Sequence, residues 1–212
     1  MIFYFSATGN SKYVAERVAG ATDDHLIFLR DAIRSRCYHF DVSLEKRIGF
    51  VVPAYCCGLP SILNFFVDKL RLSGYEDQYV YLVLTCGSAT GDAAGQLGKL
   101  LGKKGIALNA QFAVPMVDNN VTAHKIPDRE EIDRRLDGAE EYIDEACRAI
   151  RARGAGDYNR CQGALPGALT AASYPAYAFG RSTKPFVVTG ACIGCGLCQE
   201  ICPCGAITLT DG

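Results

Sequence analysis

The cysteines near the C-terminal end of the chain have the spacing of a metal-binding motif. Five of the eleven cysteines fall within 13 residues, and four of them follow the pattern C-x2-C-x2-C-x3-C: Cys192, Cys195, Cys198 and Cys202. Thiolates two residues apart on a tight loop reach several irons of one [4Fe-4S] cluster, and Gly194 and Gly196 permit the curvature. Zinc usually takes two separated cysteine pairs, and the sequence offers no second pair at suitable spacing. The motif therefore predicts an iron–sulfur cluster.

The fourth ligand of this cluster has two candidate sources. The run resembles that of bacterial ferredoxins, in which the fourth cysteine of one copy ligates the cluster of the other copy. The 212 residues contain no second copy. Either Cys202 or Cys204 closes a lone cluster, or the sequence is a truncated form and a second motif is expected in the full-length chain. We favour truncation, because half of a ferredoxin fold, about 25 residues, is hard to stabilise alone.

A second candidate site is the segment Ser6-Ala7-Thr8-Gly9-Asn10-Ser11, which follows an apolar run and precedes a helical pattern. Small residues, a glycine and three hydroxyls at a helix start can wrap a terminal phosphate with backbone N–H groups and hydroxyls. The loop lacks the lysine of a Walker motif and the spaced glycines of a dinucleotide fingerprint. It is either a phosphate loop or a Ser/Thr-rich turn that caps a helix.

Two further loops follow expected strands. The segment Pro53–Pro60 offers Tyr55 as a flat surface on which a ring can stack. The small residues of Thr85–Gly91 let the backbone approach a planar ligand closely. Each loop alone is more simply a packing tyrosine or a helix start, so the prediction depends on all three loops together. We expect buried, small apolar side chains rather than redox-active thiols at three cysteines of these loops: Cys56, Cys57 and Cys86.

Strands and helices alternate over residues 1–115, the pattern of a parallel sheet with crossover helices. Apolar runs predict five strands: Met1–Phe5, Leu26–Leu29, Ile48–Val52, Tyr79–Thr85 and Ile106–Val114. Helical periodicity predicts four helices: Lys12–Ala19, Ser61–Leu72, Asp92–Lys103 and one from an Asp128 cap to about Arg153. The alternation favours a doubly wound α/β sheet of order 2-1-3-4-5. Ligands of such sheets bind beyond the carboxyl ends of strands 1 and 3, where these loops lie.

The chain is expected to divide into three parts. Residues 1–154 form the sheet domain, and residues 31–46 within it give no assignable pattern. Residues 155–185 are a linker rich in Gly, Ala, Pro and Tyr, with aromatic anchors at Tyr174, Tyr177 and Phe179. Residues 186–212 form a partial ferredoxin-like α+β segment, with two short strand-like runs around the cysteines: Phe186–Val188 and Ala206–Leu209.

The loop sequence FSATGNS resembles the phosphate loop of flavodoxins, and PAYCCGLP and TCGSATG resemble the flavin-contacting loops of that family. The resemblance implies FMN, with its phosphate on Ser6, Thr8, Gly9, Asn10 and Ser11. It implies that the isoalloxazine ring lies near Pro53, Ala54, Tyr55, Thr85, Cys86, Gly87 and Ser88. Flavodoxins often place the ring between two aromatic side chains, but this chain has no tryptophan. Stacking is therefore one-sided, or the ferredoxin segment shields the other face.

Both ends together resemble the flavodoxin–ferredoxin fusion family, sometimes called ferrodoxins and found mainly in anaerobes. The segment Pro115–Asn120 resembles a family loop that reads MPDN. This likeness implies that Asp118 and Asn119 lie beside the flavin or at the domain interface. A plain turn after the last strand is the alternative.

Composition and charge exclude several classes of function. A formal net charge of -1 gives no basic field for nucleic acid or anionic lipid. Neither a signal peptide nor an apolar run of about 20 residues is visible, so a cytoplasmic location away from membranes is expected. An electron carrier for redox partner proteins is favoured, because no acid–base constellation and no dinucleotide domain are visible. The alternatives are an FMN-dependent oxidoreductase acting on a quinone or nitro compound, and a redox or iron sensor.

Overall fold

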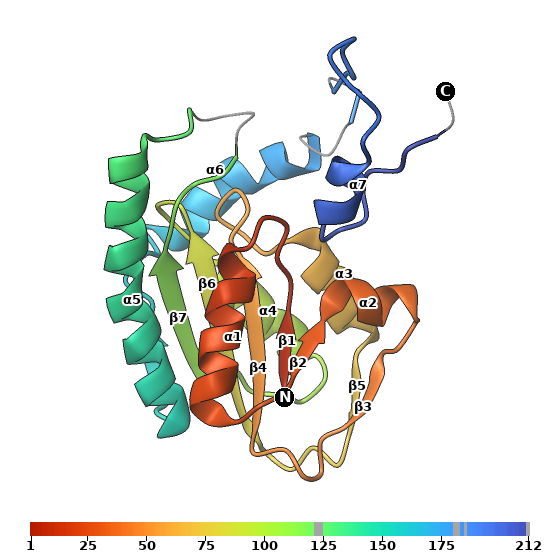
Figure 1. Ribbon diagram of the computed structural model, residues 1–212. Helices are drawn as coiled ribbons and strands as arrows, with labels where there is room; N and C mark the ends of the chain where they lie inside the picture. The colour runs from red at the N-terminus through yellow and green to blue at the C-terminus, as the bar shows by residue number, and fades with distance from the viewer. Residues whose placement is uncertain (121–124, 180–182, 185, 211–212) are drawn as a thin grey trace.

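The computed structural model describes residues 1–120, 125–179, 183–184 and 186–210. Its centre is a six-stranded parallel sheet in the order β2-β1-β4-β6-β7-β8. Figure 1 labels all of these strands except β8. These strands are β1 Ile2–Tyr4, β2 Leu26–Phe28, β4 Arg47–Pro53, β6 Tyr79–Cys86, β7 Ala110–Pro115 and β8 Gly156–Tyr158. The first five confirm the predicted order 2-1-3-4-5 and the flavodoxin-like fold class, whereas β8 at the edge was not predicted.

A separate two-stranded sheet pairs β3 (His39–Asp41) with β5 (Arg71–Ser73). Neither strand was predicted, and β5 overlaps the end of the helix expected at Ser61–Leu72. That helix ends at Lys69 because the next residue, the buried Leu70, has an extended backbone (φ -57°, ψ 132°) that leads into β5. Since β3 and β5 lie outside the main sheet, they leave its doubly wound topology unchanged.

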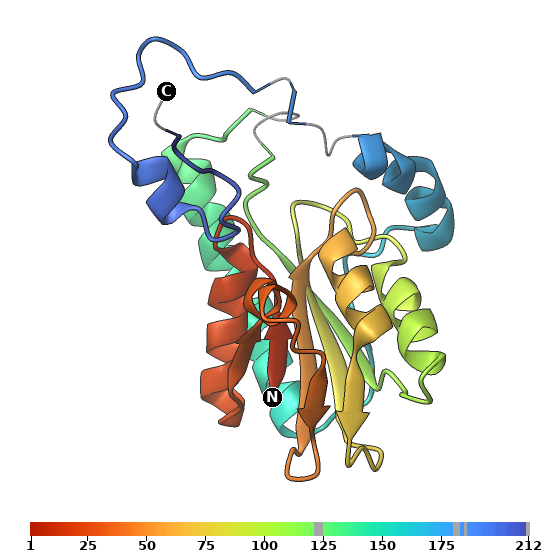
Figure 2. The same ribbon diagram turned by 90° about the vertical axis from the view of Figure 1, so that its right-hand side faces the viewer.

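Helices cover both faces of the main sheet (Figures 1 and 2). One face carries α1 (Asn10–Thr22) and α5 (Arg129–Arg151), and the other carries α2 (Leu29–Arg34), α3 (Ser61–Lys69) and α4 (Ala93–Gly102). All eight residues of β6 are buried, as expected for a strand covered on both faces. The two cores alternate along it, since Leu82 packs under α3 and α4 while Val83 packs under α1 and α5.

The predicted linker, residues 155–185, contains two elements that its sequence did not reveal, β8 and α6 (Pro166–Phe179). Strand β8 is a three-residue edge strand, too short for a periodic pattern. Helix α6 has a weak apolar pattern and contains Pro175, which usually marks the end of a helix. Of the aromatic anchors, Tyr174 and Tyr177 are described below, and the side chain of Phe179 lies outside the described residues.

In the C-terminal segment the only described helix is α7 (Leu197–Ile201). The strand-like runs predicted at Phe186–Val188 and Ala206–Leu209 were wrong, since both are irregular in the described part of the chain. Phe186 and Val188 are 67% and 85% exposed, so neither run is covered by a sheet or helix that would fix it as a strand. The predicted strand Ile106–Val114 begins only at Ala110. No helix within the described residues is long and apolar enough to span a membrane.

Candidate cofactor-binding sites

The candidate phosphate loop is open at the start of α1. Gly9 precedes the helix at φ +113°, and among the described residues no side chain caps this end. A Cβ at Gly9 would meet no described atom within 4 Å, so there is space in front of the helix. The first turn of α1 has no acidic side chain. A helix start with free space, no cap and no negative charge fits an anionic group such as a phosphate.

Other side chains of this loop hold it to the rest of the site. The Ser6 hydroxyl accepts a hydrogen bond from the Gly9 N–H at 3.1 Å. The Ser11 hydroxyl is buried and lies 2.7 Å from the Thr85 hydroxyl. The Asn10 amide donates to the backbone carbonyl of Val117 at 3.0 Å. The structure therefore gives these three side chains positioning contacts, and the exposed part of the loop is Thr8 and Gly9.

The loops after β4 and β6 lie side by side. The Ala54 N–H donates to the Thr85 carbonyl at 2.8 Å, which continues the register that pairs Pro53 with Thr85. After Thr85, the side chain of Cys86 is buried, whereas Ser88 is exposed. The structure thus brings the predicted ring-contacting segments together, with the Cys86 thiol in the interior.

The segment after β7 joins the same group of loops. An added Cβ at Gly87 would lie 2.8 Å from Cβ of Asp118, so this close approach requires glycine. The Asn119 side chain donates to the Thr8 hydroxyl. The predicted turn is present as well, because the Asn120 N–H donates to Asp118 Oδ1 at 3.0 Å. Asp118 and Asn119 therefore lie beside both other loops, and their role as flavin contacts stays a prediction.

Tyr55 begins a tight turn and is half-buried. Its N–H and carbonyl bond the carbonyl and N–H of Gly58 at 2.9 and 3.0 Å, and Cys56 and Cys57 between them have φ of +46° and +57°. Two consecutive positive φ values are those of a type I′ turn. The Tyr55 ring lies 5.6 Å from that of Tyr177, at 47°. Burial, together with neighbouring Tyr177 and Cys204, raises the pKa of Tyr55 to about 12.

Helix α6 packs on this turn through its tyrosines. The Tyr174 hydroxyl donates to the Leu59 carbonyl at 2.6 Å, and the Asn64 amide donates to the same hydroxyl at 3.1 Å. The Ser61 N–H donates to the Tyr177 hydroxyl at 3.2 Å. These contacts fall on the end of the Tyr55 loop and on the start of α3, so α6 packs beside the candidate flavin site.

The cysteine motif contains the four thiols that a cluster needs, but these side chains do not converge on one point. Cys192, Cys195 and Cys198 are exposed, and Cys202 is half-buried. Across the described ranges, no three Cys, His, Asp or Glu side chains lie close enough together to hold a metal ion. Gly194 and Gly196 have φ of +68° and +77°, in keeping with the predicted curvature. Four thiols fit a [4Fe-4S] cluster chemically, and the assignment of individual ligands stays a prediction.

The end of the cysteine segment lies on α2, at the carboxyl end of the sheet (Figure 1). The Arg30 guanidinium donates to the carbonyl of Pro203. The neighbouring Cys204 packs against the hydrophobic core on this face of the sheet, against which Tyr55 also packs. A Cβ at Gly205 would lie 3.6 Å from Nη1 of Arg34. Cys204 also lies close enough to Tyr55 to help raise the pKa of its hydroxyl, so the segment lies near the candidate flavin site.

Residues 185–208 match the 4Fe-4S binding domain family. All four predicted cluster ligands fall inside this range. The chain therefore combines a flavodoxin-like sheet with a 4Fe-4S-type segment. A search of curated proteins finds no match to the chain.

Several solved structures are similar to part of this chain. Trp repressor binding protein from Bacillus subtilis is 17% identical over 71% of this chain and 97% of its own, with a TM-score of 0.45. Two-electron reduced Megasphaera elsdenii flavodoxin is 18% identical over 66% and 97%, with a TM-score of 0.43. Rubredoxin oxygen:oxidoreductase from Desulfovibrio gigas is 16% identical over 73% and 36%, with a TM-score of 0.42. The fold class follows from the strand order, not from these likenesses.

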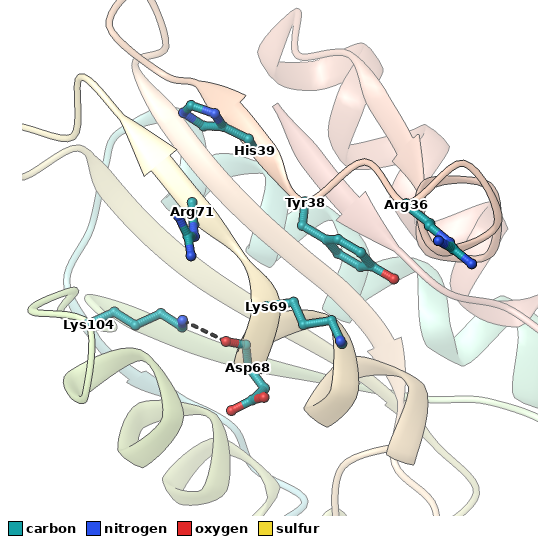
Figure 3. A pocket seen from close by; sticks show the side chains of 7 residues that line it. All are labelled: Arg36, Tyr38, His39, Asp68, Lys69, Arg71 and Lys104. Carbon is teal, nitrogen blue, oxygen red and sulfur yellow. Dashed lines mark hydrogen bonds between the residues drawn. The ribbon is translucent and has the colours of Figure 1, made fainter.

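A basic cavity lies away from these loops, at the far end of α3 (Figure 3). Its volume is about 540 Å³, and its lining has more cations than carboxylates: Arg36, Tyr38, His39, Asp68, Lys69, Arg71 and Lys104. The Lys104 ammonium donates to the Asp68 backbone carbonyl at 2.8 Å. Helix α3 begins at the Tyr55 loop, so nine residues, about 14 Å of helix, separate the cavity from the candidate flavin site. No predicted cofactor residue lines it.

Two residues near the candidate sites were missed by the sequence interpretation. Arg30 lies in the first turn of α2, just before the unassigned residues 31–46, and its contact with Pro203 joins residues 173 positions apart. Cys161 lies just after the unpredicted strand β8 and contacts the loop after β6. Neither residue belongs to a spaced motif in the sequence, so neither could have been identified as part of a site from the sequence.

Proposed function

We propose that this protein carries electrons between FMN, held by the loops at the carboxyl end of the sheet, and a [4Fe-4S] cluster held by residues 185–208. External redox proteins are the partners that exchange electrons with it. The observation that carries the proposal is that the cysteine segment lies near the candidate flavin site, where Cys204 influences Tyr55. Cys204, two residues after the last predicted ligand, packs on the same core as Tyr55, and Arg30 binds the intervening Pro203.

The chain's own residues would bind, orient and shield these groups. The start of α1 and the exposed Thr8 would hold the phosphate, and the loop at Gly87, which packs closely against Asp118, would line the ring. Tyr177 covers part of Tyr55 and so excludes water from that side. FMN exchanges one or two electrons and a [4Fe-4S] cluster exchanges one, so together they connect a two-electron donor to one-electron carriers.

The first test is a cofactor count. The chain is purified anaerobically, its visible spectrum is recorded before and after dithionite, and flavin, iron and acid-labile sulfide are measured. Flavin bands together with about four irons and four sulfides per chain would support the relay and show that Cys202 or Cys204 completes the cluster. Flavin without iron would contradict the relay but leave the flavin site standing. Protein that stays free of flavin in excess FMN would overturn the proposal.

The second test addresses the contact that holds the cysteine segment near the candidate flavin site. Arg30→Ala removes the hydrogen bond to Pro203, and Arg71→Ala, an exposed arginine on β5, is the matched control. After rapid reduction, equilibration between cluster and flavin should be slower in Arg30→Ala and unchanged in Arg71→Ala, as followed by stopped-flow absorbance. Equal rates in both variants would show that this contact does not support the relay.

Two other functions would give different results in the same preparations. Steady turnover with a quinone or a nitro compound, faster than with protein carriers, would favour a flavin-dependent reductase. Oxidation that changes partner binding or oligomeric state without turnover would favour a redox or iron sensor.

A further inference from the structure

Two cysteine thiols from distant parts of the chain meet behind the loop after β6. The Thr90 N–H, four residues after Cys86, donates to the Cys161 carbonyl at 2.8 Å. This brings the thiols of Cys86, at the end of that strand, and Cys161, just after β8, close enough to influence each other. Cys86 is buried and only 6% exposed, whereas Cys161 is half-buried. The sequence had predicted an inert apolar role for Cys86 and gave no role to Cys161. A pair with one enclosed and one accessible thiol is the arrangement of a dithiol that can be oxidised from outside.

The backbone of Cys161 is fixed by hydrogen bonds that do not involve its thiol. Its carbonyl accepts from the Thr90 N–H at 2.8 Å, and its N–H donates to Asn159 Oδ1 at 2.9 Å. The Asn159 amide in turn donates to the Thr90 hydroxyl at 2.9 Å, and both residues are buried. Thr90 is four residues after Cys86, so this framework holds the loop of Cys161 against the loop of Cys86.

A third cysteine, Cys57, lies near this pair but is held separately. Its carbonyl accepts from the Thr170 hydroxyl at 2.6 Å, and its backbone is fixed in the left-handed conformation of the Tyr55 turn. It also raises the pKa of Cys86, but its influence is smaller than that of Cys161. The Cys86–Cys161 pair is therefore the one placed for bond formation, and Cys57 serves as an internal comparison.

We propose that Cys86 and Cys161 form a redox-active dithiol that closes to a disulfide bond. Cys161 is the attacking thiol, because it is accessible and has Arg160 beside it. Cys86 is the resolving thiol, because it is enclosed and has Cys161 as its neighbour. The neighbouring Cys86 thiol and the charge of Arg160 lower the pKa of Cys161, while the Cys161 thiol and burial raise the pKa of Cys86.

The oxidant is a low-molecular-weight disulfide such as oxidised glutathione. The Cys161 thiolate attacks one sulfur, the disulfide breaks, and one glutathione thiolate leaves and takes up the proton of Cys161. The Cys86 thiol then loses its proton to the second glutathione sulfur as its own sulfur bonds to Cys161. In total, two protein thiols are oxidised by two electrons and one glutathione disulfide is reduced to two thiols.

The test is peptide mapping of the full chain, as isolated, after equilibration in glutathione buffers of graded redox potential. Remaining thiols are alkylated before digestion, and trypsin places Cys57, Cys86 and Cys161 on separate peptides, residues 48–69, 72–99 and 161–181. We expect a cross-linked peptide that joins residues 72–99 to 161–181 and appears in one two-electron transition. The half-buried Cys147, whose thiol donates a hydrogen bond to the Arg17 carbonyl, is the control and should form no cross-link.

Variants separate the two roles. In Cys86→Ser, Cys161 should stop at the mixed disulfide with glutathione, and the cross-linked peptide should be lost. In Cys161→Ser, Cys86 should stay reduced. Because Cys161 is the more exposed of the two, this variant is still informative if Cys86→Ser does not fold. Cross-links to Cys57, a mixed disulfide as the end product in the unmodified chain, or thiols that stay reduced at every potential would each overturn the proposal. None of these readouts requires flavin or iron, so the result is independent of the proposed function.

Discussion

At the scale of single residues, two neighbouring tyrosines of β6 differ in how their hydroxyls are satisfied. The Tyr79 hydroxyl donates to the Gly154 carbonyl at 2.7 Å, whereas the fully buried Tyr81 hydroxyl has no hydrogen-bond partner among the described residues. An unpaired buried hydroxyl costs stability, and a paired one contributes about 1 kcal/mol. Tyr81→Phe should therefore raise the free energy of unfolding by about 1 kcal/mol, and Tyr79→Phe should lower it by a similar amount.

Urea denaturation of both variants measures this difference. Because the two substitutions remove the same atom from the same strand, each serves as the control of the other. A loss of stability in Tyr81→Phe would mean that its hydroxyl is paired after all, for example by an internal water.

The Asp24 carboxylate provides the pH-dependent prediction at this scale. It accepts a hydrogen bond from Arg47 Nε at 2.9 Å, and its side chain is 6% exposed. Burial alone would raise the pKa of Asp24, but hydrogen bonds from Arg47 and Thr22 outweigh it and lower the pKa. A carboxyl with a lowered folded-state pKa stabilises the fold above its unfolded pKa, about 3.9, and this contribution is lost as the pH falls through the folded pKa.

Asp24→Asn should therefore lower the free energy of unfolding at pH 7 by about 3 kcal/mol, because it leaves the Arg47 charge buried without its partner. Below about pH 4 the difference from the unmodified chain should shrink. Asp133→Asn, which breaks an exposed pair with Arg129, is the control and should change stability little at any pH. Thermal unfolding across pH 3 to 8 measures both, and a constant difference at all pH values would contradict the assignment.

At the scale of elements, α6 holds two loops of the candidate flavin site through one hydroxyl. Thr170 donates to the Cys57 carbonyl at 2.6 Å and accepts from the Asp92 N–H at 2.7 Å. Thr170→Val keeps the shape but leaves both backbone groups unpaired, so it should cost about 1 to 3 kcal/mol in urea denaturation. On the same helix, Ser173→Ala removes only a bond to the Leu169 carbonyl within α6 and should have little effect. Equal effects of the two variants would show that α6 does not hold these loops.

At the scale of the whole molecule, the sequence predicted the features that are determined by residues close together along the chain. In a doubly wound sheet, the loops after neighbouring strands meet at the carboxyl end of the sheet. Recognising the apolar strands was therefore enough to predict that residues 6–11, 53–55 and 85–88 lie close together. The cysteine spacing likewise identified the 4Fe-4S segment. The pairing of Arg30 with Pro203 and of Cys86 with Cys161 joins remote segments, and no local periodicity marks such contacts. Strand β8 and strands β3 and β5 of the separate two-stranded sheet have three residues each, too few to give a recognisable alternation of apolar and polar residues.

The C-terminal segment and the sheet contribute unequally to folding. None of the described residues of α7 is buried, and Phe186, Val187 and Ile193 are between 67% and 86% exposed. Its contacts with the sheet are few, chiefly those of Pro203 and Cys204. Removing residues 186–212 uncovers little of either hydrophobic core. The shortened chain should therefore keep one cooperative unfolding transition, with a free energy within about 1 kcal/mol of the full chain.

Removal of residues 156–212 is the matched comparison, because it also takes away β8 and α6. Those elements supply an edge strand to β7 and the hydrogen bonds of Thr170 and Tyr174, so this deletion should lower the free energy of unfolding by several kcal/mol. Urea denaturation of the three chains, with flavin content measured on each, distinguishes the outcomes. If the first deletion already abolishes cooperative unfolding, the segment is part of the folding unit. If it does not, the sheet is a scaffold that folds first and presents the Tyr55 surface on which the cysteine segment then packs.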